Sequence, residues 1–239
     1  MRNKLSAKPF LSSSKGQGLV EYALILVGVV LAVVLAVTLM GDTVKSTYCR
    51  VAQGLGGGGC GCAFGFDSDE EIAEWSGENE DGYFKVEEGQ ACMTGNGNAR
   101  TFLHPCSEDF GTDDIVIHAT YVTVEDAGKG NSGFDILFRA QDENNHYKFI
   151  YNGDAHYVRF WKLVYGKWIL LNTQKVPKAW KNEVLNFRIE VRGSNFKAYR
   201  DDEFLLEAND SMYTQGQIGL RNKPGSKTCF DEFSVQPLP

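Results

Sequence analysis

Basic residues are scarce in most of this sequence. Its 239 residues include 24 Lys and Arg against 31 Asp and Glu. Four of the basic residues, Arg2, Lys4, Lys8 and Lys15, lie among the first sixteen positions, where there is no acidic residue. Without that segment 20 basic residues face the 31 acidic ones, which leaves a net charge of −11. Because binding to nucleic-acid phosphates needs a basic face, the composition argues against a nucleic-acid partner.

Cysteine is absent from the first 48 residues. An even number of cysteines follows, which predicts disulfides in an oxidising compartment. They are Cys49, Cys60, Cys62, Cys92, Cys106 and Cys229. Six cysteines allow fifteen pairings, so the sequence leaves the connectivity open. Cys92 with Cys106 is the preferred pair, because the two bracket a short segment that could form a hairpin.

Metal-binding patterns are also missing. Cys60 and Cys62 could supply two thiolates, but their spacing is not that of a zinc pair and no Cys or His pair completes the set. The histidines show no spacing that indicates a catalytic or metal cluster; they are His104, His118, His146 and His156. Packing or surface roles suffice for them.

One long apolar run extends from Leu19 to Met40. As a helix it would be about 33 Å long, enough to cross a hydrocarbon core of about 30 Å. Basic residues precede the run and no compensating cluster follows it, so we expect the amino terminus in the cytoplasm and the rest of the chain outside.

No small-residue cleavage site follows a short apolar core, as it would in a Sec-type signal peptide. Instead, residues 14–26, SKGQGLVEYALIL, precede and open the apolar run. They resemble the class III signal peptide and processing site of Flp-type pilins, the type IVb pilins of tight adherence. The resemblance implies that a prepilin peptidase cuts between Gly16 and Gln17. Glu21 and Tyr22 would then be the fifth and sixth residues of the processed chain.

Glu21 also stands out on physical grounds. A carboxylate at mid-membrane costs about 2.5 to 3.5 kcal/mol, so it is usually functional or paired. Cleavage after Gly16 creates an α-ammonium four residues away, and in a filament of stacked helices Glu21 can meet that amine on a neighbouring subunit. The alternative is an interfacial Glu21 that reaches the lipid headgroups.

Helical spacing continues beyond the apolar run, at Val44, Tyr48, Val51 and Leu55, and glycines then interrupt it. We therefore divide the chain into a leader (1–16), a transmembrane and assembly helix (17–55), a glycine-rich linker (56–62) and an outer domain (63–239). Flp-type pilins usually end near the linker, so the outer domain is an addition to that pattern.

The outer domain lacks any convincing helical period. Short runs rich in Val, Ile, Phe, Tyr and Trp are separated by Gly, Asn, Asp and Pro, which predicts an all-β two-sheet jelly-roll sandwich. The predicted strands cover 115–124, 134–140, 146–151, 157–164, 168–171, 185–191, 196–199, 217–221 and 230–235.

Several stretches of this domain resemble the concanavalin A-like, laminin G-like superfamily, in particular family 66 carbohydrate-binding modules. They are FRAQD (138–142), WK (161–162) before GKW (166–168), FRIEV (187–191), AYRDD (198–202), YTQGQIGL (213–220) and FDEFSV (230–235). The glycine that usually follows the aspartate of the family's Asp-Gly turn is replaced here by Asp202, so the sequence does not predict the conformation of that hairpin turn.

Lectin sites combine aromatic platforms with polar groups, because sugars present both C–H faces and hydroxyls. The candidate ligand-binding residues are Arg139, Asp142, Tyr147, Arg159 and Trp161. Period-two counting allows Tyr147, Arg159 and Trp161 to share a sheet face. The alternative is an arginine network that only supports the sheet. The remaining tryptophans, Trp75, Trp168 and Trp180, are interpreted as core or edge residues.

Catalysis is not expected. Glycosidases need two carboxylates flanking the scissile bond, and the acidic run 67–71 (DSDEE) lies beside the first strand rather than within a central one. The superfamily often holds calcium near its joined first and last strands, where Asp67 and Asp231 would lie. Two such residues do not supply the six to eight oxygen ligands of calcium.

The sequence thus predicts a pilin-like subunit of an extracellular type IV filament that displays a lectin-like domain for adhesion or glycan binding. It would first lie in the cytoplasmic membrane and then reach the cell surface by self-assembly. The alternative is a membrane-anchored carbohydrate-binding or glycoside-hydrolase-like surface protein that does not polymerise. A sandwich that only spaces or decorates a filament is a third reading.

Overall fold

The computed structural model describes residues 24–27, 29, 61–77, 83–94, 101–106, 113–123, 133–223 and 227–238. The chain divides into two units, Met1–Val51 and Ala52–Pro239. In the first unit, residues 24–27 and 29 are helical and exposed. The remainder of the predicted helix, and with it Gly16, Gln17, Glu21 and Tyr22, lies outside the described residues.

Among the described residues, no helix is both long enough and apolar enough to cross a membrane. The predicted membrane span, leader and linker stay predictions, except that Cys62, predicted as the last residue of the linker, begins the first strand of the sandwich.

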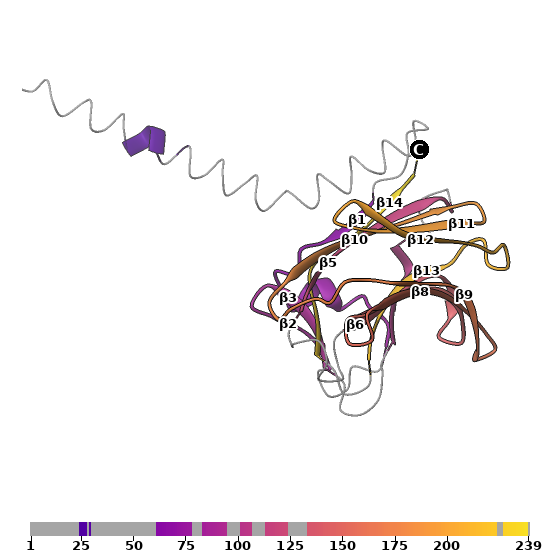
Figure 1. Ribbon diagram of the computed structural model, residues 1–239. Helices are drawn as coiled ribbons and strands as arrows, with labels where there is room; N and C mark the ends of the chain where they lie inside the picture. The colour runs from indigo at the N-terminus through magenta and orange to yellow at the C-terminus, as the bar shows by residue number, and fades with distance from the viewer. Residues whose placement is uncertain are drawn as a thin grey trace, which may run out of the picture. The chain divides into compact units, whose positions relative to one another are not determined.

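The second unit consists of two antiparallel β-sheets that face each other (Figure 1). The larger sheet has the strand order β12-β11-β10-β5-β14-β3-β2, with β1 also paired to β14; the smaller sheet has the order β4-β13-β6-β7-β8-β9. The strands are β1 (Cys62–Phe64), β2 (Phe84–Glu87), β3 (Gln90–Thr94), β4 (Thr101–His104), β5 (Ile115–Val122), β6 (Gly133–Asp142), β7 (Asn145–Asn152), β8 (Tyr157–Val164), β9 (Lys167–Lys175), β10 (Val184–Arg192), β11 (Asn195–Arg200), β12 (Glu203–Asn209), β13 (Gln217–Asn222) and β14 (Lys227–Pro237). The predicted two-sheet sandwich is confirmed.

Every predicted strand overlaps an observed one, and β8 has the predicted bounds. The short strands β1 to β4 and the hairpin strand β12 were not predicted. Glu203–Asn209 reads EFLLEAN, in which acidic residues and adjacent leucines obscure the period-two alternation that marks a strand.

Aromatic side chains fill the space between the sheets. Phe134 and Phe149 of the smaller sheet contact Phe187 of the larger one, with ring centroids 5.1 and 5.8 Å apart. All three are buried. Burial of such a side chain contributes about 1.5 to 3 kcal/mol, so this layer dominates the stability of the sandwich.

Two disulfides join segments that are distant in sequence. Cys92 pairs with Cys229 across the neighbouring strands β3 and β14, and Cys62 of β1 pairs with Cys106, which follows β4. The predicted presence of disulfides is confirmed, but the preferred pair Cys92–Cys106 is wrong. The expected hairpin does not form because β3 and β4 belong to different sheets. Cys49 and Cys60 lie outside the described residues.

The β11–β12 hairpin turns at Asp201 and Asp202, both of which have positive φ, 50° and 63°. Two successive positive φ values are typical of the type I′ turn, and Asp tolerates this region better than most residues other than Gly. The hairpin therefore forms although Asp202 stands where glycine is usual.

Candidate functional site

The surface of the smaller sheet that points away from the core is the candidate site. Residues paired in register on neighbouring antiparallel strands point to the same side of a sheet. One such row is Arg221, Asp135, Ile150, Arg159 and Thr173. The next row is Gly219, Leu137, Lys148, Trp161 and Leu170, and a shorter row is His146, Leu163 and Trp168. We call the surface formed by these three rows the outer face.

Lys148 is an unusual residue for such a surface because only 2% of it is exposed. Its Nζ lies 2.6 Å from Oδ2 of Asp135, and Arg221 Nη1 lies 3.4 Å from the same oxygen. Burial lowers the pKa of Lys148 to about 8, while the negative charge of Asp135 acts in the opposite direction. The outer face thus contains a buried ion pair with a second cation beside it.

Trp168 lies over this ion pair. The ammonium of Lys148 is 3.6 Å from the centroid of the Trp168 ring, and the guanidinium carbon of Arg221 is 5.7 Å from it. Cation–π contacts of this kind contribute about 0.5 to 2 kcal/mol and fix the orientation of the ring. Trp168 nevertheless remains 45% exposed, so it offers an aromatic surface to a ligand.

Trp161 and Arg159 continue the same surface. The rings of Trp161 and Trp168 meet edge to face, with centroids 6.0 Å apart. The guanidinium carbon of Arg159 lies 3.7 Å from the centroid of Tyr157 and 5.9 Å from that of Trp161. The outer face therefore combines aromatic rings with cationic side chains, and Arg159 and Trp161 share it, as period-two counting predicted; their role in ligand binding stays a prediction.

Tyr147 does not share this face. Its register partner on β8 is Lys162, whereas Trp161 is paired with Lys148. The Tyr147 ring is fully buried in the core against Phe196, and its hydroxyl donates to Asp210 Oδ1 at 2.5 Å. The expectation that Tyr147 lies on one face with Arg159 and Trp161 is wrong.

Asp142 stabilises a turn. Its Oδ1 accepts hydrogen bonds from the backbone N–H of Asn144 at 2.7 Å and from Nδ2 of Asn145 at 2.9 Å. Such bonds are typical of Asp at the start of a tight turn, here the one that joins β6 to β7. Among the described residues, the one contact of Asp142 with the outer face is made by its backbone oxygen, which lies 3.3 Å from Nδ1 of His146, and the Asp142 carboxylate serves the turn.

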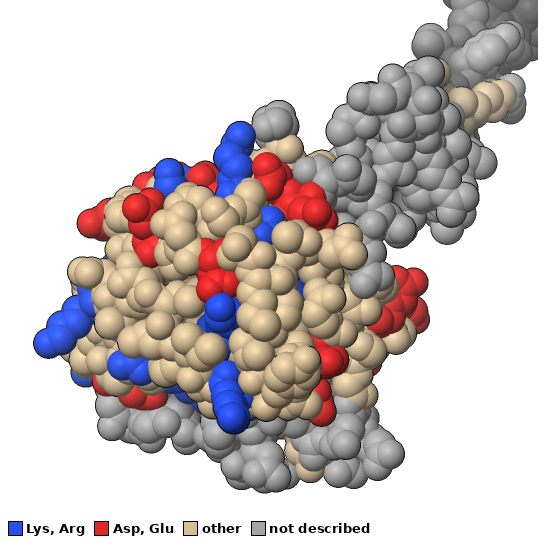
Figure 2. Space-filling view, turned by 90° about the vertical axis from the view of Figure 1, so that its right-hand side faces the viewer, with Lys and Arg blue, Asp and Glu red and all other residues tan. Residues whose placement is uncertain are grey.

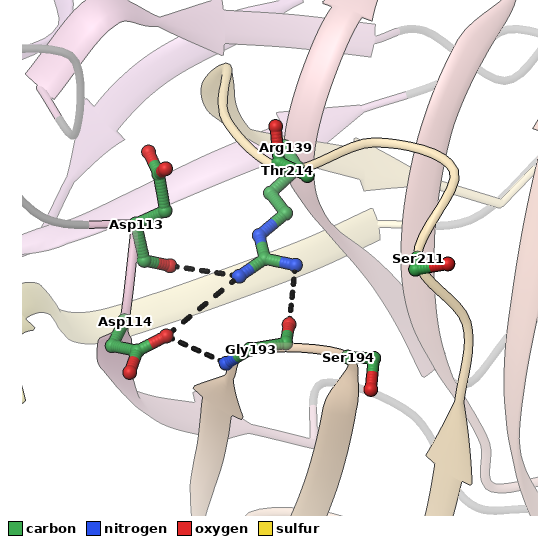
Figure 3. A pocket seen from close by; sticks show the side chains of 7 residues that line it. All are labelled: Asp113, Asp114, Arg139, Gly193, Ser194, Ser211 and Thr214. Carbon is green, nitrogen blue, oxygen red and sulfur yellow. Dashed lines mark hydrogen bonds and ion pairs between the residues drawn. The ribbon is translucent and has the colours of Figure 1, made fainter.

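Arg139 lies at a different place, in a polar hollow of about 540 Å³ (Figure 3). Its guanidinium donates to the backbone oxygens of Gly193 at 2.7 Å, Asp113 at 3.0 Å and Tyr213 at 3.3 Å. The Oδ1 of Asp114 lies 4.0 Å from the same guanidinium. Arg139 therefore connects three chain segments. This arrangement agrees with the alternative that the arginine supports the fold rather than binds a ligand.

Among the described residues, no aromatic side chain lines the hollow around Arg139. Its lining consists of Asp113, Asp114, Arg139, Gly193, Ser194, Ser211 and Thr214. A hollow without rings offers hydrogen bonds but no apolar surface for the C–H face of a sugar. The outer face is for this reason the better candidate.

Asp135, Lys148, Trp168 and Arg221 were not among the candidates from the sequence. A sign was present, because Asp135 and Lys148 each stand between two apolar or aromatic residues within a predicted strand. Alternation places such a residue on the face opposite the core. That the two charges meet depends on the β6–β7 register, which the sequence does not show.

The predicted calcium ligands Asp67 and Asp231 are both exposed. Within the described ranges, no three His, Cys, Asp or Glu side chains are grouped so that they could hold a metal ion. Cys62 forms a disulfide.

The acidic run at 67–71 has structural contacts. Residues Asp69–Ile72 form a short 3₁₀ helix, η1. Asp69 Oδ1 accepts a hydrogen bond from the backbone N–H of Val86 at 2.8 Å, and Glu71 Oε2 accepts one from that of Phe66 at 2.6 Å. The predicted surface turn accounts for these carboxylates.

Charge is mixed on the face that Figure 2 presents. On the face that Figure 2 presents, Lys and Arg side chains are interspersed with Asp and Glu side chains, without a continuous field of one sign. This face therefore offers no broad basic surface to nucleic-acid phosphates.

Comparison with known proteins extends this description. No family model matches the chain. A levanase of Bacillus subtilis is 32% identical over 102 residues, which are 41% of this chain and only 14% of the levanase. The matched region is therefore less than half of this chain and a small part of the levanase.

Solved structures share the fold. The carbohydrate-binding module CBM66 from Bacillus subtilis superposes with a TM-score of 0.50 at 23% identity, over 69% of this chain and 92% of the module. A protein of unknown function with a galectin-like fold from Bacillus subtilis superposes with a TM-score of 0.57 at 14% identity, over 75% of this chain and 96% of that protein. An endo-β-1,3-glucanase from Pyrococcus furiosus superposes with a TM-score of 0.53 at 11% identity, over 75% of this chain and 94% of the glucanase. The carboxyl-terminal part of the chain thus has the galectin-like sandwich fold found in carbohydrate-binding modules, and its expected resemblance to family 66 modules is confirmed at the level of fold.

Proposed function

We propose that the sandwich binds carbohydrate on its outer face and does not cleave it. The observation that carries the proposal is the Trp168 ring, which is partly exposed, held over Lys148 and adjoined by Trp161. An aromatic ring fixed in this way matches the C–H face of a sugar, and nearby cations and amides can bind its hydroxyls. The match to levanase and the fold shared with CBM66 support the same reading.

Hydrolysis is the second candidate, because the levanase and the glucanase are named as enzymes. A glycosidase needs two carboxylates, about 5 to 5.5 Å apart for retention or about 6.5 to 9.5 Å apart for inversion. Among the residues of the outer face, Asp135 is the only carboxylate, and Lys148 and Arg221 already engage it. This arrangement favours binding over cleavage.

The test is retention of polysaccharides by the full chain, immobilised in detergent at high density on beads. We expect wild-type protein to retain one or more polysaccharides of a panel and Trp168→Ala to weaken retention about tenfold, which corresponds to 1.4 kcal/mol. Trp180→Ala is the matched control, because Trp180 is 63% exposed and does not belong to the outer face. Equal retention by both variants would exclude the outer face, and release of reducing ends would favour the enzyme.

The finer proposal concerns the first unit. The class III signal peptide motif at residues 14–26 and the apolar run that follows support a pilin-like role, in which the chain assembles into an extracellular filament and displays the sandwich. Many copies on one filament would raise the effective concentration and convert weak sugar contacts into adhesion. A membrane-anchored protein that does not polymerise would display the same domain as single copies, and immunogold labelling along an appendage distinguishes the two.

Processing can be measured directly. We expect the surface protein to begin at Gln17, because the basic leader and the Gly16–Gln17 junction match the site of a prepilin peptidase. Mass spectrometry of the amino-terminal peptide checks this result, and Gly16→Asp is the variant expected to block processing. An intact Met1, or a terminus beyond Met40, would contradict the pilin-like proposal while leaving carbohydrate binding intact.

A further inference from the structure

Arg159 differs from the other buried or half-buried arginines that the structure describes. Each of the others lies within 4.0 Å of a carboxylate; these pairs are Arg139–Asp114, Arg188–Glu190, Arg200–Asp201 and Arg221–Asp135. Within the described part of the chain, no carboxylate lies within that distance of Arg159. The half-buried Arg159 therefore has no partner of opposite charge among the described residues.

The contacts of Arg159 hold its guanidinium in place without neutralising it. Nε donates to Thr173 Oγ1 at 3.2 Å, and the guanidinium carbon lies 3.7 Å from the centroid of Tyr157. Stacking on a ring and a single bond through Nε leave the two terminal nitrogens for an external acceptor. A guanidinium whose orientation is already fixed loses little entropy when it binds a carboxylate in bidentate geometry.

Charge around Arg159 also favours an anion. The outer face carries Lys148, Arg159 and Arg221 against the single carboxylate of Asp135. Lys175, the register partner of Tyr157, adds an exposed cation beside this face. The excess positive charge is local, because the whole chain has a net charge of −7. An anionic ligand would be attracted to this part of an otherwise acidic protein.

We propose that the ligand is an acidic polysaccharide whose uronate carboxylate binds Arg159 while its sugar ring lies against Trp161 and Trp168. The proposal rests on the proposed carbohydrate-binding function and names the class of sugar. The guanidinium carbon is 5.9 Å from the centroid of Trp161. A uronate carries its carboxylate directly on the pyranose ring, so one sugar residue can reach both the arginine and the aromatic surface.

The test compares polyuronates with their neutral counterparts on bead-bound full chain. The probes are polygalacturonate, alginate and hyaluronate, each also in carboxyl-reduced form. We expect at least one acidic polymer to be retained about tenfold more tightly than its reduced form, and Arg159→Gln to abolish that difference. Arg192→Gln is the matched control. Arg192 is an exposed arginine of β10 in the other sheet, and it forms no ion pair with any described residue.

Four other outcomes would each overturn the inference. Equal retention of acidic and reduced polymers, with no effect of Arg159→Gln, would leave carbohydrate binding standing and remove the preference for uronates. Equal losses in the Arg159 and Arg192 variants would indicate non-specific charge attraction. Retention of poly-glutamate that depends on Arg159 would identify an acidic polypeptide as the partner. Failure to retain any polysaccharide, neutral or acidic, would remove the proposed function as well. Unchanged thermal unfolding of Arg159→Gln confirms that the variant is folded.

Discussion

Replacing Asp135 by alanine is expected to lower the free energy of unfolding by about 3 to 5 kcal/mol. The reason is Lys148, whose ammonium is buried and lies 2.6 Å from the Asp135 carboxylate. Without that carboxylate a buried charge would remain uncompensated, and the pKa of Lys148, already lowered to about 8 by burial, would fall further. Urea denaturation at pH 7 measures the change.

The double variant Asp135→Leu with Lys148→Met is the control for this experiment. Replacing both members of a buried ion pair by apolar side chains is often neutral or stabilising, so we expect the double variant to recover most of the loss. If Asp135→Ala alone lowered the free energy of unfolding by less than about 1 kcal/mol, the ion pair would behave like a solvent-exposed one. That result would contradict the prediction. The same variants show whether Trp168 needs the ion pair beneath it to bind a ligand.

Removing the disulfide between Cys92 and Cys229 is the other change with a large expected effect. The two residues are separated by 137 positions, and a native disulfide typically contributes about 2 to 5 kcal/mol. We expect Cys92→Ala with Cys229→Ala to lower the stability by that amount, because the unfolded chain gains the freedom that the bridge denies it. Chemical denaturation of the oxidised proteins provides the measurement.

The second bridge, Cys62–Cys106, is the matched comparison because it closes a shorter loop of 44 positions. Chain entropy makes the longer loop worth only about 1 kcal/mol more, so the two double-alanine variants should have similar stabilities, with the Cys92 and Cys229 variant the less stable. If the Cys92 and Cys229 variant were as stable as the wild type, the bridge would not contribute to folding.

The Tyr147 error shows how far sequence reasoning reaches on the candidate site. Counting by two correctly places Arg159 and Trp161 on one face of β8, because successive side chains of an extended strand point to opposite sides. It does not relate β8 to β7. Tyr147 and Lys148 differ by a single position, and a shift of one residue in register exchanges the two faces. The observed register pairs Trp161 with Lys148, which turns Tyr147 into the core.

Arg139 illustrates a second limit. An arginine between a phenylalanine and an alanine in a strand is compatible with either a ligand contact or a support for the fold. Its partners are backbone oxygens at positions 113, 193 and 213, which are between 26 and 74 residues away along the chain. Local sequence contains no information about contacts over such separations.

Sequence patterns alone predicted nine of the fourteen described strands, the existence of disulfides in the outer domain and the two-sheet sandwich. These features follow from short-range chemistry, because period-two patterns, turn residues and an even set of cysteines are properties of neighbouring positions. The order of the strands, the pairing of the cysteines and the meeting of Asp135, Lys148, Trp168 and Arg221 on one surface became visible only in the folded domain. Those contacts depend on sheet order and register, which are set by the packing of the whole core rather than by any one segment.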